Sequence, residues 1–208
     1  MSTTGSTARI DLVLGSTSRY RAELLRRLTP HFRQAAPDVD ESRQPGEAPA
    51  ALAARLARAK AEAVARRHPG AIVIGSDQVA SLDDQILGKP GSAERACADL
   101  ATCSGRRVQF HTALCVVDAR VTPAQVHADI DLTEVHFREL SAGEIARYVR
   151  REQPLDCAGS FKSEGLGIAL FERITSDDPS ALIGLPMIPL CRLLGRAGID
   201  VLSLAEAD

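Results

Sequence analysis

The 208-residue chain lacks several features that each indicate a particular class of protein. It has no tryptophan, and aromatic residues make up only 3% of it. The formal net charge of -2 provides no basic field to hold a phosphate backbone, so we expect no nucleic-acid partner. No apolar stretch approaches the roughly 18 residues of a membrane span, and Met1–Ala8 is too polar and short for a signal peptide. We therefore expect a cytoplasmic protein with no membrane partner.

Familiar catalytic and metal-binding motifs are missing as well. The five cysteines are odd in number and show no C-x-x-C spacing, which argues against a zinc knuckle or a dithiol redox site. Gly88-Lys89 is followed by Pro90, so the chain has no P-loop. It has neither H-E-x-x-H nor G-x-S-x-G. Its chemistry must rest on other residues.

Lysine is scarce too. Only Lys60, Lys89 and Lys162 are lysines among the 25 basic residues. In a chain so biased toward arginine, a lysine suggests a position that needs a compact ammonium group. An equal alternative is that the three lysines lie on the surface by chance. Lys60 continues the spacing of Leu52 and Leu56 on a predicted helix, so it either snorkels from the apolar stripe or reaches into a cleft.

The central feature is an apolar run within residues 71–80, which reads as a buried strand that stops at Gly75-Ser76. Asp77 and Gln78 would then stand beyond its carboxyl end, where ligands gather in α/β sheets. The alternative is that Asp77 only opens a turn or caps the next element.

A second candidate site follows the first apolar strand, residues 10–15. Ser16-Thr-Ser18 leads into a helix predicted over 19–28. The hydroxyls and first helical amides would form an anion site, with Arg21 as a bidentate donor. Ordinary helix capping explains the same residues equally well.

The remaining segments complete an α/β pattern within one domain, residues 1–208, with residues 1–8 and 203–208 as flexible tails. Residues 31–46 read as an acidic loop. The other expected elements are a helix over 49–67, a hairpin over 79–87, a helix over 92–103, long strands over 107–118 and 125–138 with a bulge near Glu134, a helix opened by the Ser141/Glu144 capping box, a Gly/Ser-rich loop over 156–167, a strand over 168–174, a short helix capped by Asp178, a last helix ending at 195–198 and a final strand over 199–202.

The sequence thus combines a turn that could bind phosphate, acidic residues at a strand end and in a loop, and a few cationic side chains. This combination is typical of metal-assisted phosphoanhydride chemistry. The same residues resemble the Maf family of nucleoside triphosphate pyrophosphatases over nearly the whole chain, residues 10–198. The matching blocks are Leu-Gly-Ser16-Thr-Ser, Val-Asp-Glu41, the helix with Lys60, Gly-Ser-Asp77-Gln78, Gly-Lys89-Pro and Cys-Ala-Gly-Ser-Phe-Lys162-Ser-Glu164-Gly. All three lysines fall within these blocks.

The resemblance implies an elongated mixed α/β sheet flanked by helices, with a substrate cleft between two lobes, as in inosine triphosphatase-like proteins. It also implies a divalent metal, Mg²⁺ or Mn²⁺, and a homodimer. Asp77-Gln78 and the block from Cys157 look like the branch that hydrolyses 7-methyl-GTP; the branch preferring dTTP and UTP has Thr at position 78. The family's usual second arginine at the first turn is Ala22 here, which leaves Arg21 alone there.

From this resemblance we assign Asp77 as general base and Glu41, with Asp77, as metal ligands. The residues expected to bind phosphate are Ser16, Arg21, Lys60, Lys89 and Lys162. Tyr20, Gln78 and Glu164 are expected to select the base, because N7-methylation makes guanine a cation that stacks on an electron-rich ring. The alternatives are that Tyr20 packs on its helix and that Glu164 pairs with Lys162. The alternative functions are a dTTP/UTP pyrophosphatase of the same family and a nucleotide sensor without turnover that is linked to division arrest.

Overall fold

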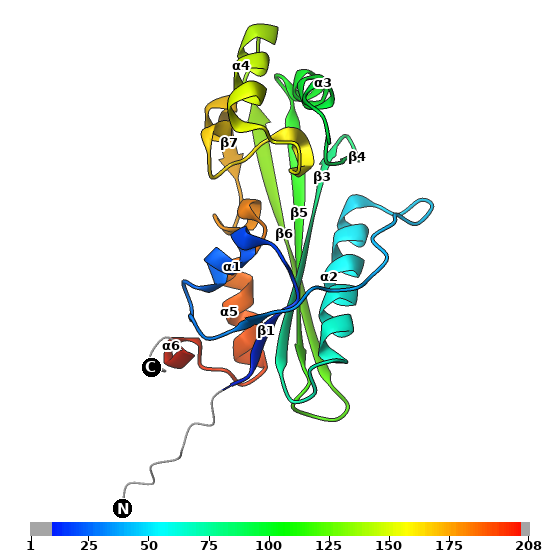
Figure 1. Ribbon diagram of the computed structural model, residues 1–208, viewed down its shortest axis with the longest axis vertical. Coiled ribbons are helices and arrows are strands. Elements are labelled where there is room, and N and C mark those ends of the chain that lie inside the picture. Colours follow the sequence, from blue (N-terminus) through cyan, green and yellow to red (C-terminus); the bar gives the residue numbers. More distant parts are fainter. Residues whose placement is uncertain (1–9, 205–208) are drawn as a thin grey trace, which may run out of the picture.

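A computed structural model describes residues 10–204 and shows an elongated molecule built on one seven-stranded sheet (Figure 1). The strands lie in the order β2-β1-β3-β5-β6-β7, with β4 paired to β3. β1 is parallel to β2 and β3, whereas the other pairs are antiparallel. Their bounds are β1 Leu12–Leu14, β2 Arg33–Gln34, β3 Ile72–Leu82, β4 Gln85–Leu87, β5 Arg107–Asp118, β6 Gln125–Phe137 and β7 Phe171–Thr175.

The helices cover the sheet in two groups (Figure 1). At one end α1 and α5 lie on one face and α2 on the other, and at the far end α3 and α4 pack side by side. The helices are α1 Arg19–Leu25, α2 Pro49–Ala65, α3 Ala93–Cys103, α4 Ala142–Glu152, α5 Met187–Arg196 and α6 Val201–Leu204, with 3-10 turns η1 Ala158–Ser160, η2 Leu166–Leu170 and η3 Ala181–Ile183. The expected mixed sheet flanked by helices is confirmed.

Three hydrophobic clusters form the core, and alternating residues of β3 divide between them. Ile72 and Ile74 face the cluster under α1 and α5, whereas Val73 faces the cluster under α2. The third cluster joins Ala80 and Leu82 to α3 and α4 at the far end. This alternation follows from the two-residue period of a strand. As a result, β3 contributes residues to all three clusters.

Helix α2 lies unusually close to β3. Pro49 occupies its first turn, and small residues such as Ala57 and Ala61 face the sheet. A Cβ built on Gly75 would come within 2.4 Å of the Ala57 carbonyl oxygen. Glycine at position 75 therefore permits the backbone contact that places the middle of α2 directly over β3.

Local sequence signals located most helices correctly. The Ser141/Glu144 capping box is present, and Gln153 ends α4 in the left-handed conformation. Ser92 caps α3, and Pro186 restarts the chain as α5. Each of these signals acts within one turn of helix, so no distant contact was needed to predict it.

Several strand predictions were wrong. β3 does not stop at Gly75-Ser76 but runs to Leu82, because its pairing with β5 continues without a break. β5 and β6 also pair continuously, so there is no bulge near Glu134; the irregularity lies between His136 and Phe137, in the pairing with β7. The apolar alternation of β6 lies on an open face: Ile130 and Leu132 are 41% and 44% exposed.

Predictions near the carboxyl end and in two loops also needed correction. The strand expected over 199–202 is instead the short helix α6, because the Asp200 carboxylate accepts from Leu202 N and Ser203 Oγ at its start. Ser203 and Leu204, expected in a tail, belong to that helix, and residues 1–8 lie outside the described residues. β2 falls in the segment expected to be loop, and η2 replaces the first half of the strand expected over 168–174. Within residues 10–204 no helix is long and apolar enough to cross a membrane.

Candidate functional site

The candidate site lies at an interruption in the pairing of β3. On one edge β1 pairs with Ile72–Ile74 and β4 pairs with Ala80–Leu82, and no strand of the described chain pairs with the residues between them on that edge. The turn after β1 and the chain leaving β4 flank this gap. Asp77 lies at its centre, within β3 and not beyond the carboxyl end of the strand as the sequence predicted.

Three side chains from separate elements meet at the gap. The Lys60 ammonium of α2 lies 2.6 Å from Asp77 Oδ1 and 2.8 Å from Glu41 Oε1. The side chains of Lys60 and Asp77 are 8% and 9% exposed, whereas that of Glu41 is 59% exposed. Lys60 therefore does not snorkel to solvent, and its ammonium is buried against the two carboxylates. The two carboxylates are close neighbours because they share one ammonium.

The electrostatics of Asp77 combine burial with nearby cations. Burial raises the pKa of its carboxyl group, while Lys60 and then Arg21 act in the opposite direction. A carboxylate with increased proton affinity, held against a cation, is a suitable proton acceptor.

Arg21 reaches the same site from α1. Its Nε donates to the Gly184 carbonyl at 2.8 Å, and Nη1 lies 3.4 Å from Ser16 Oγ. Burial lowers the pKa of the guanidinium, and the carboxylates of Asp77 and Glu41 oppose that shift. Arginine nevertheless stays charged in proteins. Ser18 caps α1 as expected, accepting from Arg21 N at 3.3 Å, so capping and site formation coexist at this turn.

Two carboxylates suit only certain metals. No group of three or more His, Cys, Asp or Glu side chains that could hold an ion occurs among residues 10–204. Glu41 and Asp77 alone fit a hard ion such as Mg²⁺, which keeps several waters and binds largely through substrate phosphates. The donor set therefore fits the expected metal and does not fit a closed structural site.

Gln78 faces away from Asp77, as adjacent strand residues must. Its Nε2 donates to Thr112 Oγ1 and to the carbonyls of Ala181 and Leu182, at 3.0 to 3.1 Å. Carbonyl oxygens can only accept, which determines the orientation of the amide. Gln78 thus attaches η3 to the sheet, and its NH₂ group is not directed at an open pocket.

A pocket of about 370 Å³ lies beyond η3, against β6 and β7. Apolar side chains line much of it: Ile168, Ile174, Leu182 and Ile183. Glu164 and Ser163 line it from the Gly/Ser-rich loop. The wall residue Ile183 directly precedes Gly184, whose carbonyl binds Arg21, so one short segment connects the pocket with the site at Asp77.

Comparison with known proteins assigns a family. A sequence profile described as Maf-like protein matches residues 11–197. The chain belongs to the Maf-like protein family. It is 57% identical over 191 residues to a protein of Albidiferax ferrireducens named 7-methyl-GTP pyrophosphatase, covering 92% of this chain and 95% of that one. A Xanthomonas oryzae pv. oryzae protein of the same name is 58% identical over 190 residues, covering 91% and 98%.

A solved structure supports the fold. The Staphylococcus aureus Ham1 protein superposes with a TM-score of 0.50 at 14% sequence identity, covering 89% of this chain and 99% of that one. At this identity the match concerns the fold alone. It agrees with the elongated mixed sheet described here.

Two lysines of the Maf-like blocks lie away from the Asp77 contacts. Lys162 Nζ donates to the carbonyls of Glu152 and Gln153, at 3.0 and 3.5 Å, and so caps the carboxyl end of α4. Lys89 is exposed just after β4, beside the gap, and no described side chain pairs with its ammonium. Only Lys60 is placed on the carboxylates.

Tyr20 is already in contact with a cation. Arg19 Nη2 donates to its hydroxyl at 2.8 Å, and the Arg19 guanidinium lies 4.7 Å from the ring centroid. Sequence reasoning missed this contact and also the role of segment 181–184, which binds Arg21, Ser76 and Gln78. That segment acts through backbone carbonyls. Carbonyls leave no signature in side-chain identity.

Proposed function

We propose that this Maf-like protein is a nucleoside triphosphate pyrophosphatase that converts 7-methyl-GTP to 7-methyl-GMP and pyrophosphate. The observation that carries the proposal is the convergence of Asp77, Lys60 and Glu41 at the gap in β3. The names of the relatives support the choice of substrate. A cytoplasmic location and a homodimer stay predictions.

Asp77 is the proposed general base. Lys60 binds its Oδ1, which leaves Oδ2 to accept a proton from the attacking water. The water oxygen bonds to the α-phosphorus, the bond from that phosphorus to the bridging α–β oxygen breaks, and pyrophosphate leaves with the bonding electrons. A positioned base contributes about 10²- to 10⁴-fold to the rate.

The cations of the site neutralise the phosphates. Arg21, with Ser16, lies on one side of the gap, Lys60 lies behind Asp77 and Lys89 follows β4. Charge placed in advance where the leaving group develops its own charge needs no reorganisation during the reaction. Lys162, also predicted to bind phosphate, would first have to release the carbonyls of α4.

Glu41 and Asp77 would hold the Mg²⁺ or Mn²⁺ ion. When bound, such an ion polarises the phosphoryl oxygens and stabilises charge on the leaving pyrophosphate. Glu41 is the more exposed of the two carboxylates, so it meets the solvent side of the bound phosphates.

The base is proposed to enter the pocket lined by Glu164. Its carboxylate would accept from the guanine N1–H and exocyclic amine, as carboxylates accept from base donors elsewhere. A methylated base could stack on the Tyr20 ring only from the face opposite Arg19. Gln78 would contribute by holding η3, which forms one wall of the pocket.

The test is pyrophosphate release from 7-methyl-GTP, GTP, dTTP and UTP with Mg²⁺ or Mn²⁺. We expect preference for 7-methyl-GTP, and a loss of about 10²- to 10⁴-fold in Asp77→Asn. Asp84→Asn is the matched control: Asp84 lies exposed in the β3–β4 turn at positive φ, a conformation that Asn also adopts. Tight nucleotide binding without metal-dependent pyrophosphate release would refute the enzyme and support a sensor.

A further inference from the structure

Glu41 lies in a segment with no regular structure. Residues 37–48 form neither helix nor strand, and most of their side chains are exposed. Glu41 itself is held by one ion pair, with Lys60, in which its own side chain is 59% exposed. Because the Glu41 end of this pair lies largely in solvent, the pair constrains the loop less than a fully buried pair would. Another interaction must keep this carboxylate beside Asp77.

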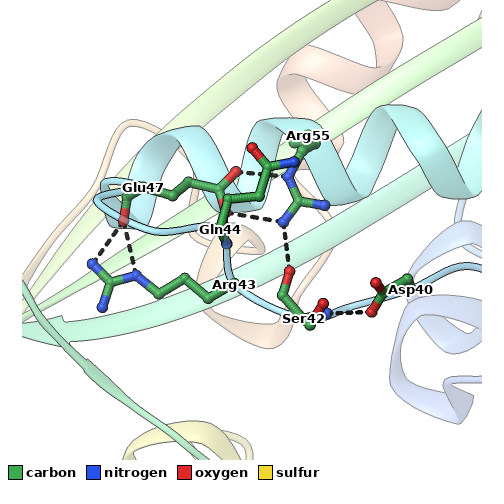
Figure 2. A network of polar contacts seen from close by, with 6 residues as sticks. All are labelled: Asp40, Ser42, Arg43, Gln44, Glu47 and Arg55. Atoms are coloured by element: carbon green, nitrogen blue, oxygen red, sulfur yellow. Dashed lines mark hydrogen bonds and ion pairs between the residues drawn. The ribbon is translucent and has the colours of Figure 1, made fainter.

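Arg55 of α2 provides such an interaction (Figure 2). Its Nε and Nη2 bind the two carboxylate oxygens of Glu47 at 2.6 and 2.9 Å, and Nη2 also donates to the Ser42 carbonyl at 2.9 Å. The planar guanidinium suits this forked contact, which an ammonium cannot reproduce. One arginine therefore ties together two points of the segment, Ser42 and Glu47, which lie seven residues and two residues before the start of α2.

Glu47 is the centre of the network. Its side chain is 8% exposed, and its Oε2 also accepts from Gln44 N at 3.0 Å. The Glu47 carbonyl accepts from Arg43 Nε and Nη2 at 2.9 and 2.7 Å. The hydrogen bond from Arg55, followed by that from Gln44 N, lowers the pKa of the Glu47 carboxyl to about 2. The pair is therefore fully charged at neutral pH.

We propose that the Arg55–Glu47 pair is a latch that positions Glu41 for the reaction, an inference that rests on the proposed function. Arg55 binds the backbone carbonyl of Ser42, the residue directly after Glu41. Lys60 receives the Glu41 carboxylate five residues further along the same helix, a rise of about 7.5 Å. Gly75 lets α2 pack directly on β3. The helix therefore holds its contacts with Ser42 and with Glu41 at a fixed position relative to Asp77. Arg55 is thus a positioning residue that acts through Glu41.

The first test compares Arg55→Gln with Arg58→Gln. Arg58 lies on the same helix, is 61% exposed and pairs with Glu62, away from the loop. Residues that support metal ligands typically contribute about 10- to 100-fold, so we expect a loss of that size in Arg55→Gln. The loss should be larger at limiting than at saturating metal. Arg55→Lys should recover little, and Arg58→Gln should match wild type.

The second test asks whether Arg55 acts through Glu41. In the Glu41→Gln background, adding Arg55→Gln should reduce activity no further, because the carboxylate to be positioned is already gone. A structural readout independent of activity is hydrogen exchange of residues 38–48 together with trypsin cleavage after Arg43. Both should be faster in Arg55→Gln and in Glu47→Gln, and unchanged in Arg58→Gln.

The outcomes separate the latch from the proposed function. Full activity in Arg55→Gln with a clear loss in Glu41→Gln would overturn the latch alone, as would unchanged exchange and proteolysis. Additive losses in the double variant would also overturn it, because Arg55 would then act independently. Full activity in Glu41→Gln would refute the role given to Glu41 and the latch with it.

Discussion

Replacing Gly75 with alanine tests the contact on which the site is built. The new Cβ would lie 2.4 Å from Ala57 O, 2.7 Å from Ala61 N and 2.8 Å from Ala61 Cβ. The first two are backbone atoms of α2, so no side-chain rotation can relieve the clash. The helix must move away from β3 by about 1 Å to restore ordinary contact distances.

The size of the effect follows from the same geometry. Overpacking in a well-packed core costs about 1–3 kcal/mol, and for a domain of this length each kcal/mol lowers Tm by roughly 2–4 °C. We therefore expect a fall of roughly 2–12 °C. Lys60 lies between Ala57 and Ala61 and would move with them away from Asp77. Misplacement of about 1 Å can cost on the order of 10²-fold in rate.

The assay combines thermal unfolding with pyrophosphate release, measured well below the variant's Tm so that the loss reflects geometry and not unfolding. Gly195→Ala is the control, because Gly195 lies in α5 with open space around its Cβ position. There, alanine should stabilise the helix by up to about 1 kcal/mol and leave activity unchanged. Wild-type Tm and activity in Gly75→Ala would refute the argument that this contact sets the site.

Two further predictions follow from the structure. Ser141 and Arg138 lower the pKa of Glu144 to about 2, so its contribution to stability is complete above its ordinary pKa near 4.5 and is lost as pH falls toward 2. Glu144→Gln should flatten the dependence of Tm on pH in that range, and an unchanged slope would contradict the assignment. Gln78→Leu removes the hydrogen-bond donor of Leu182 O, whereas Ala181 O keeps its bond from Thr112. The free energy of unfolding should fall by about 1–3 kcal/mol and KM for 7-methyl-GTP should rise. An unchanged KM would show that η3 has no part in binding the base.

Periodicity alone could not predict which face of a strand is covered by the rest of the protein. The apolar alternation of β6 has the correct two-residue period, yet Ile130 and Leu132 lie on the open face. The covered face carries Asp131 and Thr133, which are both buried. Their burial is tolerated because they hydrogen-bond to one another and to Ser176. That arrangement depends on a segment more than 40 residues away. Alternation identifies a strand but not which face its neighbours cover.

Residues of the candidate site could be predicted where the signal lies in the neighbouring sequence, and could not where it depends on distant backbone contacts. Lys60 could be found because its helical spacing places it on a buried stripe and because lysine is rare in this chain. Asp77 could be found because it follows an apolar run, although the strand continues past it. Lys162 could not be placed, because its partners are the terminal carbonyls of α4, which any sequence would present.

Under the proposed function, neighbouring residues of β3 would serve different parts of a nucleotide. Asp77 faces Lys60 and the site proposed for the phosphates, whereas Gln78 faces η3 and the wall of the pocket proposed for the base. Because Gln78 already uses its NH₂ group on the chain itself, its influence on the base must pass through the position of Leu182 and Ile183. A substitution at position 78 would therefore change substrate preference by reshaping the pocket, while the phosphate chemistry one residue away keeps its geometry. The two proposed roles could therefore vary separately on one strand.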